Sequence, residues 1–342
     1  MVDERARARI ESSALSRRSL LERGAAIGLG AAGAAMGAGR VRALQTPSDP
    51  AAGSFGGNLT VAIIGELVTL DEQSTSSGLT RDVTLPIYET LLAFDDDYRP
   101  QPLLARSMTP SDDGLIWTNE LRQGVRFHNG EAMTSADVKA SMDRWGQLSG
   151  LGKKLYAAIE GVETPDDYTV TVRLSSPLGT LPISLAHTTQ NCVIYPKSVI
   201  DAGSLEPIEV CIGTGPYKLS ERKSDAYIRL ERFDEYAPLE GGPRGYGGTK
   251  YAYVDSIDFI PVPDIAARVA GLQAGTYLMH MPEGLENDLY QTLVDSPGLV
   301  TSVNQPSEWP LLYCNWQSPL MSKLAMREAV QACLDMQPIM EA

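Results

Sequence analysis

The sequence predicts an α/β fold. A β-branched, apolar run at residues 59–64 is typical of a buried strand. A second strand-like segment, residues 257–259, is followed at once by a helix start at Asp264. A third pattern, a capped amphipathic helix from Thr134, follows a β-rich stretch. Strands and helices that alternate along 342 residues indicate two domains or one large one.

The N-terminal elements follow the first strand in order. A polar loop runs from Glu66 to Gly78. We expect a helix over residues 82–94, with Pro86 near its start, because its apolar residues recur at helical spacing. These residues are Val83, Ile87, Leu91 and Leu92. The acidic run at residues 95–97 then predicts a turn.

The middle of the chain is predicted to be rich in strands. Two strand-like segments in residues 115–127 flank the turn pair Gln123-Gly124. Thr134 and Asp137 have the spacing of a capping box for the helix that carries Val138, Met142 and Trp145. Residues 168–174 alternate apolar and polar side chains, which predicts a half-buried strand.

The C-terminal part repeats the change from strand to helix. After the strand at 257–259, Asp264 caps a predicted helix with Ile265, Val269 and Leu272 on one face. The glycine-rich segment 241–248 has the composition of a surface loop.

Composition and charge exclude some classes of partner. The chain has 29 Lys and Arg against 43 Asp and Glu, a net charge of -14. Nucleic acid is excluded as a partner because no basic stripe is present. No window has the roughly 18 to 20 strongly apolar residues that a membrane span requires. We therefore expect that the mature protein, from which the signal peptide described below has been cleaved, does not span the membrane.

Residues 1–43 are predicted to be a twin-arginine signal peptide. Arg17 and Arg18 precede a Gly/Ala-rich stretch and a small-residue site at Val41-Arg42-Ala43. The alternative is an Ala-rich helix packed on the core, which the recurring glycines disfavour. Cleavage after Ala43 would leave a protein free in the periplasm.

The four cysteines lack the C-x-x-C spacing of a zinc site. In an oxidising compartment, Cys192 and Cys211 either form a disulfide across the loop between them or stay free and buried. Cys314, in an expected strand, and Cys333, on an expected helix, are predicted to be core residues.

No catalytic or cofactor motif is present. The three histidines have no second ligand at helical spacing, so we expect no metal site. The G-x-S-x-G elbow of serine hydrolases is missing. Pro216 and the glycine spacing around Gly213 argue against a phosphate loop. We therefore expect no cofactor and no enzymatic activity.

Three ordered motifs resemble a known family, the extracellular solute-binding proteins of family 5. The most specific is Leu121 to Gly130 with Thr134 to Val138, which looks like the family's strand-turn-strand and helix start. Ile212 to Leu219 and Tyr88 to Leu92 are similar to two further family motifs, and Ala325 to Val330 resembles the helix that opens the second lobe. Asn119 departs from the pattern, where the family usually has an apolar residue.

The resemblance implies a periplasmic binding protein-like type II clamp of two lobes. Residues 44–303 would form lobe one, with an inserted β-rich subdomain at about 90–185. Residues 304–342 would hold the hinge strand, near 311–316, and the start of lobe two. Because the family typically continues well past this helix, lobe two is expected to be largely missing from the chain.

The resemblance also indicates where a ligand would lie in such a clamp. We expect contacts from the polar loop after the first strand, then from the 188–190 segment, and finally from the hinge, where an aromatic ring can stack. For the loop residues, ordinary solvation is the alternative. The candidates are Thr69, Ser74, Thr188, Gln190, Asn315 and Trp316.

The resulting hypothesis is an exported, monomeric binding protein for a small solute, with peptides as the first choice. It would deliver the solute to the permease subunits of an ABC transporter. The alternatives are a sensor that presents its ligand to a receptor and, less favoured, a secreted hydrolase.

Overall fold

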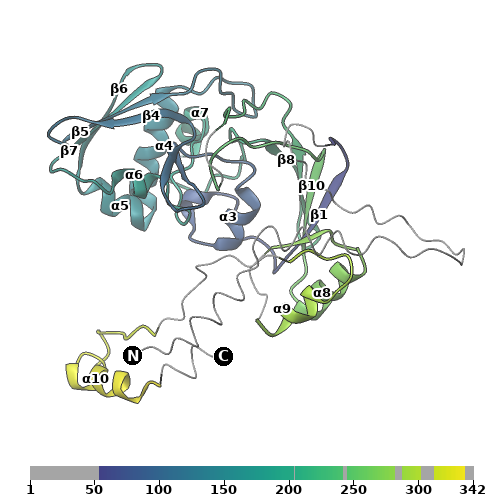
Figure 1. The fold of residues 1–342 in the computed structure, drawn as a ribbon. Helices are drawn as coiled ribbons and strands as arrows, with labels where there is room; N and C mark the ends of the chain where they lie inside the picture. Colours follow the sequence, from purple (N-terminus) through teal and green to yellow (C-terminus); the bar gives the residue numbers. More distant parts are fainter. Residues whose placement is uncertain (1–53, 204, 242–244, 282–286, 302–311, 336–342) are drawn as a thin grey trace, which may run out of the picture. The chain divides into compact units, whose positions relative to one another are not determined.

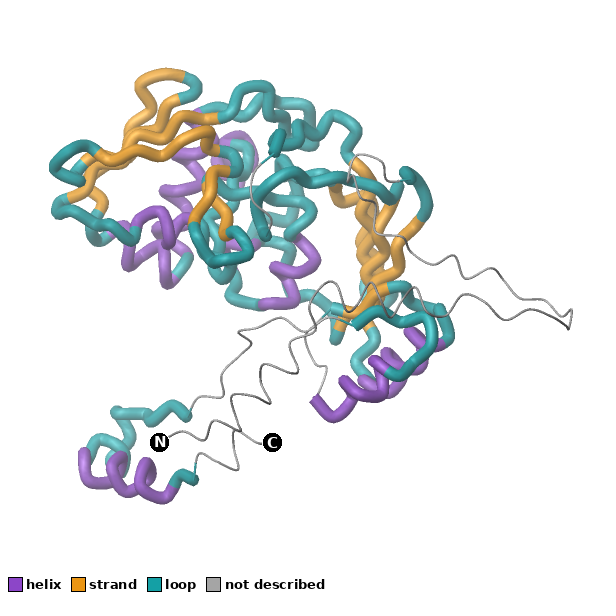
Figure 2. The backbone as a smooth tube through the Cα atoms, in the orientation of Figure 1, coloured by secondary structure: helices purple, strands orange, loops and turns teal. Residues whose placement is uncertain are grey.

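The structure, a computed structural model, describes residues 54–203, 205–241, 245–281, 287–301 and 312–335. The proposed signal peptide, with Arg17 and Arg18, lies outside the described residues. Figure 1 shows the elements and Figure 2 shows that the longer strands gather in two separate sheets.

The first sheet is mixed and has five strands in the order β11-β1-β10-β9-β8. β1 pairs in parallel with β10 and β11, whereas β10, β9 and β8 pair antiparallel. Figure 1 labels β1, β10 and β8 of this sheet, and β9 lies between β10 and β8. The strands are β1 (Asn58–Ile63), β8 (Tyr217–Lys223), β9 (Tyr227–Arg232), β10 (Ser256–Pro261) and β11 (Met279–His280).

The second sheet is antiparallel, with the order β4-β5-β7-β6, and a short β2-β3 hairpin precedes it in the chain. Helices α4 and α5 pack against this sheet. The elements are β2 (Leu92–Phe94), β3 (Pro100–Pro102), β4 (Ala105–Pro110), β5 (Ile116–Leu121), α4 (Ser135–Leu148), α5 (Gly150–Tyr156), β6 (Ile159–Asp166) and β7 (Thr169–Leu174).

The remaining helices are short. They are the 3-10 helix η3 (Glu72–Ser74), α3 (Gly78–Thr84), α6 (Leu181–Leu185), α7 (Lys197–Gly203), α8 (Ile265–Gln273), α9 (Asn287–Val294) and α10 (Leu324–Cys333). α10 has an apolar stripe, but none of its residues is buried among the described residues.

Each sheet has its own hydrophobic cluster. Trp117, Val170 and Trp145 belong to the cluster under the four-stranded sheet and α4. Val61, Ile228 and Phe259 belong to the cluster of the five-stranded sheet. The segment from Ile87 to Leu92 supplies residues to both clusters, so this segment joins the two cores.

The structure confirms the predicted helix caps, whose hydrogen bonds join residues close together in the chain, and four of the predicted strands. Asp137 and Thr134 form the predicted capping box at the start of α4. Asp264 caps α8, with its carboxylate accepting from the Ala267 N–H at 2.7 Å. β1, β5, β7 and β10 occupy the predicted strand positions.

The predicted helix over residues 82–94 is wrong. α3 begins earlier, at Gly78, and ends at Thr84, where the C-cap residue Leu85 donates its N–H to the Arg81 carbonyl. Pro86 has no N–H to continue the ladder. The carbonyls of Pro86 and Ile87 instead accept from Tyr217 and Gly215, and the chain enters β2 at Leu92. The apolar residues that suggested a helix are spaced as they are because they are buried along a segment without regular secondary structure.

Three smaller expectations also fail. Beyond Gln123-Gly124 the structure has only an isolated bridge, between Arg126 and Ala132. Residues 312–315, which include Cys314, form no strand, so the described part of the expected hinge strand is irregular. Cys314 is only partly buried and Cys333 is exposed, so neither is a core residue among the described residues.

Candidate ligand-binding site

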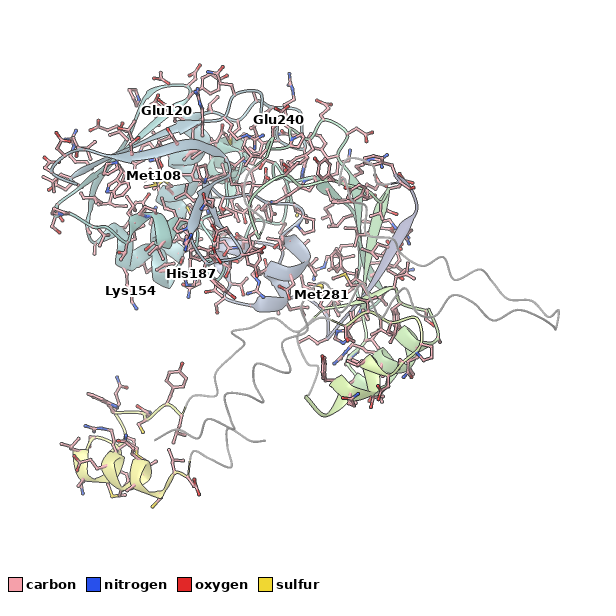
Figure 3. All side chains as sticks on the ribbon, viewed as in Figure 1. Met108, Glu120, Lys154, His187, Glu240 and Met281 are labelled. Atoms are coloured by element: carbon pink, nitrogen blue, oxygen red, sulfur yellow. The ribbon has the colours of Figure 1, made fainter. Side chains whose placement is uncertain are left out.

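A small hollow of about 30 Å³ is lined by α3, the segment that follows it, and the loop 186–193. Its charged and amide lining residues are Glu72, Arg81, Glu89, Asn191 and Lys250. We call it the Glu72 hollow. His187, labelled in Figure 3, is exposed and also lines it.

Glu72 is a buried carboxyl group at this site, with 3% of its surface exposed. The Thr84 hydroxyl donates a hydrogen bond to its carboxylate, and the Glu72 N–H donates to the Tyr195 hydroxyl at 3.1 Å. Burial raises the pKa of Glu72 to about 7, against the opposing effects of Thr84 and the Arg81 charge. At neutral pH this carboxyl group therefore exchanges between its ionised and protonated forms.

Glu89 is the second buried carboxylate of the hollow, and three side chains donate to it. The Tyr236 hydroxyl donates to Oε1 at 3.0 Å, and Lys250 Nζ lies 3.4 Å from the same oxygen. The Thr214 hydroxyl donates to Oε2 at 3.0 Å. Glu89 therefore ties the motif from Tyr88 to Leu92 to the motif around Thr214.

The glycines around Thr214 allow a close backbone contact. A Cβ on Gly213 would lie 2.1 Å from the Ile87 carbonyl oxygen, and a Cβ on Gly215 would lie 2.3 Å from that of Pro86. His128 braces the segment, because its Nδ1 accepts from the Gly213 N–H and its Nε2 lies 3.0 Å from the Gly215 carbonyl oxygen. The glycine motif therefore has a structural role, because it packs one segment of the backbone closely against another. This agrees with the sequence-based expectation that it is not a phosphate loop.

Asn191 differs from the two carboxylates because its amide oxygen has no partner. The residue is 7% exposed and lines the hollow, yet Oδ1 accepts no hydrogen bond within the described part of the chain. Buried polar groups in native proteins are normally paired with protein or water. This oxygen is therefore a buried acceptor without a partner among the described residues.

A separate cluster of fully paired groups lies beside the hollow, which we call the Asp71 cluster (Asp71, Gln73, Arg144 and Tyr195). Arg144 Nη2 and Asp71 Oδ2 form an ion pair at 2.6 Å, with side chains 1% and 0% exposed. The Tyr195 hydroxyl donates to Asp71 Oδ1 at 2.9 Å, and the Ile208 N–H donates to Oδ2 at 3.1 Å. Gln73 donates to the Ser141 and Val193 carbonyls. The cluster holds η3 against α4.

The structure places Thr188, among the residues predicted to contact ligand, in the lining of the hollow. Thr69 and Ser74 instead bond locally around η3: the Thr69 hydroxyl accepts from the Asp71 N–H at 3.0 Å, and the Ser74 hydroxyl donates to the Asp71 carbonyl at 3.0 Å. Neither of these two lines the hollow.

Gln190 has a structural role. Its backbone is left-handed, with φ at 56°. Its Oε1 accepts from the Leu151 N–H at 3.0 Å and from the Ser149 hydroxyl at 3.1 Å, while its carbonyl accepts from Trp145 Nε1 at 2.7 Å. These bonds fix the loop against α4 and α5, directly before Asn191.

The two hinge candidates interact within their own segment. Asn315 Oδ1 accepts from the Gln317 N–H at 3.0 Å. Trp316 is 68% exposed and its ring stacks with the Arg327 guanidinium at 4.4 Å. Neither lines the Glu72 hollow.

The Cys192–Cys211 disulfide is not formed, and both residues are free thiols. They belong to different cores: Cys192 packs in the cluster of the four-stranded sheet, and Cys211 packs against the other cluster. The Tyr88 hydroxyl bonds to Cys211 Sγ at 3.1 Å, and burial raises the pKa of this thiol to about 12. Within the described residues, no cluster of His, Cys, Asp and Glu could hold a metal ion.

Sequence reasoning missed Glu72, Glu89 and Asn191. Glu89 lies inside a motif quoted for the family resemblance, which was a usable signal. Glu72 and Asn191 carry no local signal, because their importance comes from burial by segments distant in the chain.

These features define a chain with the mixed α/β architecture of periplasmic binding proteins and a polar hollow beside its joined cores. The chain belongs to the bacterial extracellular solute-binding proteins of family 5, whose middle region matches residues 99–342. The family resemblance read from the sequence is confirmed. No helix among the described residues is long and apolar enough to cross a membrane.

Curated relatives extend this match. The chain is 29% identical over 336 residues to a probable peptide ABC transporter periplasmic-binding protein of Sinorhizobium fredii, covering 96% of this chain and 60% of the relative. It is 32% identical over 223 residues to the glutathione-binding protein GsiB of Salmonella paratyphi A, covering 64% of this chain and 41% of the relative. The chain thus spans about half the length of these relatives.

Solved structures share the fold over part of their length. The Helicobacter pylori periplasmic binding protein DppA in complex with the peptide STSA is 25% identical, with a TM-score of 0.60 over 71% of this chain and 50% of that one. The Bacillus subtilis oligopeptide-binding protein AppA in complex with a nonapeptide is 26% identical, with a TM-score of 0.59 over 72% and 47%. The mannopinic acid complex of MoaA, 23% identical with a TM-score of 0.71 over 84% and 57%, supports the fold alone.

Proposed function

We propose that this protein is the solute-binding component of an ABC importer, with small peptides as its first ligand class. The observation that carries the proposal is the family 5 match over residues 99–342. Relatives named for peptide and glutathione binding support the ligand class.

The clamp organisation is part of the same proposal. Residues 44–303 would form lobe one, and residues 304–342 the hinge and the start of lobe two. The four-stranded sheet, residues 105–174, falls within the proposed insertion at 90–185. Thr188 would contact ligand from the wall of the hollow. Closure of a second lobe over that wall would exclude water from the solute.

A binding screen on the full chain tests the proposal. The panel contains dipeptides, tripeptides, tetrapeptides, glutathione and opines, each measured by thermal shift and then by calorimetry. We expect at least one peptide to raise the melting temperature in a saturable way, because a ligand that binds only the native state stabilises it. A panel without one saturable ligand would contradict the proposed function.

Delivery to the periplasm is a separate part of the proposal, through the twin-arginine route. Arg17→Lys combined with Arg18→Lys should keep the protein in the cytoplasm of a host that carries this export machinery. Fractionation of cells expressing the unchanged chain is the control. Export of the double variant at the unchanged level would show that another route is used.

A further inference from the structure

A groove of about 490 Å³ lies beside the Glu72 hollow, and we call it the Tyr98 groove. Its walls are the turn at residues 95–98 and the segment 245–250. The two walls are joined by a β-bridge between Asp95 and Gly245 and by a hydrogen bond from the Tyr246 N–H to the Phe94 carbonyl at 2.9 Å. The groove is therefore preformed. The lining residues that matter here are Pro86, Asp95, Asp96, Tyr98, Pro216 and Tyr246.

Tyr98 is held in a strained backbone conformation at this groove. Its φ is 58°, and its N–H donates to the Asp95 carbonyl at 3.0 Å to close the turn. A left-handed backbone is unfavourable for a bulky side chain, and glycine would close the same turn without that cost. Strain of this kind is retained where the side chain itself is needed. The Tyr98 ring is 52% exposed, and that of Tyr246 is 38% exposed.

The charges of the groove favour a cation. The Asp95 carboxylate accepts from two backbone N–H groups of its own turn, at 2.9 Å each, and from Gln101 at 2.8 Å. Asp96 is exposed beside it. The charge of Lys250, which also lines the groove, is compensated by the buried carboxylate of Glu89 at 3.4 Å. The groove therefore presents two carboxylates to whatever enters it.

An arginine side chain fits this combination of groups. A guanidinium group stacks on tyrosine rings and pairs with carboxylates, while its aliphatic stem packs on apolar surface such as the rings of Pro86 and Pro216. Sites for small molecules enclose most of the ligand, whereas half of the Tyr98 ring is open to solvent. The missing cover is better supplied by a protein surface, and tyrosine and arginine are the residues enriched at the centres of protein interfaces.

We propose that the Tyr98 groove docks an arginine side chain of a partner protein. The Asp96 carboxylate pairs with the guanidinium group, and Tyr98 and Tyr246 stack against it. This interaction is additional to solute binding and does not depend on the identity of the solute.

The test uses a pentapeptide probe, an arginine flanked by two alanines on each side, with an acetylated amino end and an amidated carboxyl end. The counterpart carries citrulline, which has nearly the same shape without the charge. Binding to the isotope-labelled full chain is followed through amide chemical shifts. We expect the arginine peptide to bind at least about fivefold more tightly and to shift residues 94–98 and 245–250.

Two neighbouring aspartates provide a matched pair of variants. Asp96→Asn removes the charge that lines the groove, and we expect it to reduce the preference for arginine over citrulline by about threefold. Asp97 is also exposed, but it does not line the groove, and its carboxylate lies 3.6 Å from Arg99 Nη1. Asp97→Asn should leave the preference unchanged.

Tyr98 provides a second pair. Tyr98→Gly removes the ring and adopts the positive φ readily, so it should fold at least as stably as the unchanged protein. We expect it to weaken binding of the arginine peptide by about fivefold. Tyr98→Phe keeps the ring and should bind like the unchanged protein.

Several results would overturn the proposal. These are equal affinities for arginine and citrulline, an equal loss in Asp97→Asn and Asp96→Asn, undiminished binding by Tyr98→Gly, or shifts confined to residues 186–193. Guanidinium ion that binds as tightly as the arginine peptide would assign the groove to a small cation and overturn the protein partner. Each of these results would leave the solute-binding proposal intact, because that is tested by the ligand panel.

Discussion

The Asp71 cluster and the Glu72 hollow start from adjacent residues but differ in how their polar groups are satisfied. In the cluster, Asp71 accepts from Arg144, Tyr195 and two backbone N–H groups. In the hollow, burial raises the pKa of Glu72 to about 7, and the amide oxygen Oδ1 of Asn191 accepts no hydrogen bond within the described residues. The carboxylates of both groups have hydrogen-bond partners, but the hollow also contains one amide oxygen that has none among the described residues.

This difference shows how buried polar residues can be assigned to structure or to function. A complete network fixes the chain, and removal of one member leaves an uncompensated charge. An incomplete network costs stability and is therefore expected where binding benefits from it. The two neighbouring groups should respond to substitution in opposite ways.

The largest expected effect is at the Asp71 cluster. Asp71→Ala leaves Arg144 buried without its ion-pair partner, and we expect a loss of about 3–5 kcal/mol in the free energy of unfolding. Urea denaturation measures it. Asp71→Leu combined with Arg144→Met should recover most of the loss, because both charges are removed. A loss below about 1 kcal/mol for Asp71→Ala would show that the cluster is not structural.

Glu72 should behave in the opposite sense. Its folded pKa, about 7, lies above its ordinary value of 4.5. The native state is therefore most favoured below pH 4.5, and stability falls as the pH rises to about 7. Glu72→Gln lacks this penalty and should be more stable than the unchanged protein by up to about 3 kcal/mol at pH 8.

Urea denaturation at pH 5 and pH 8 checks this prediction. The advantage of Glu72→Gln should be small at pH 5 and large at pH 8. Glu240, which is exposed and labelled in Figure 3, supplies the matched change. Glu240→Gln should alter stability at pH 8 by less than about 0.5 kcal/mol. A less stable Glu72→Gln at pH 8 would place Glu72 with the structural cluster instead.

His128 gives a third, smaller response with the reverse pH sign. Both ring nitrogens bond to the backbone around Thr214, and burial lowers the pKa of His128 from 6.5 to about 4. Protonation favours the unfolded state as the pH falls from 6.5 to 4, so we expect a loss of about 2 kcal/mol over that range. His128→Gln should flatten this part of the stability profile, and an unchanged profile would contradict a neutral, partly buried ring.

The smallest expected effect is at Gln190. Gln190→Ala loses the two bonds to Oε1 but keeps the left-handed backbone, so we expect a loss of about 1–2 kcal/mol. Gln190→Gly loses the same bonds but adopts the positive φ readily, and should therefore cost less than Gln190→Ala. Thermal denaturation of both variants measures the order. An equal or larger loss for glycine would show that φ is not strained.

Sequence patterns predicted the elements whose hydrogen bonds close within a few residues. The capping box of Thr134 and Asp137 and the cap at Asp264 are of this kind. The helix predicted over 82–94 failed because the carbonyls of Pro86 and Ile87 are taken by a segment far along the chain. The spacing of apolar residues does not indicate that a distant segment will bond to these carbonyls in place of a helix.

The candidate site was predicted less completely for the same reason. Thr188, predicted from the family resemblance to contact ligand, lines the hollow. Gln190 was predicted to contact ligand, and its side chain bonds to Ser149 and Leu151 at the start of α5. Glu72 and Asn191 become site residues only when packing buries them, and no local pattern encodes that burial.

Amide hydrogen exchange of the full chain, with and without the tightest-binding peptide of the panel, tests the central claim most directly. The account predicts added protection in residues 72–90 and 186–193, which line the Glu72 hollow, and little change in the four-stranded sheet at 105–174. Protection confined to that sheet, with residues 186–193 exchanging as before, would contradict the claim that the hollow is the solute site.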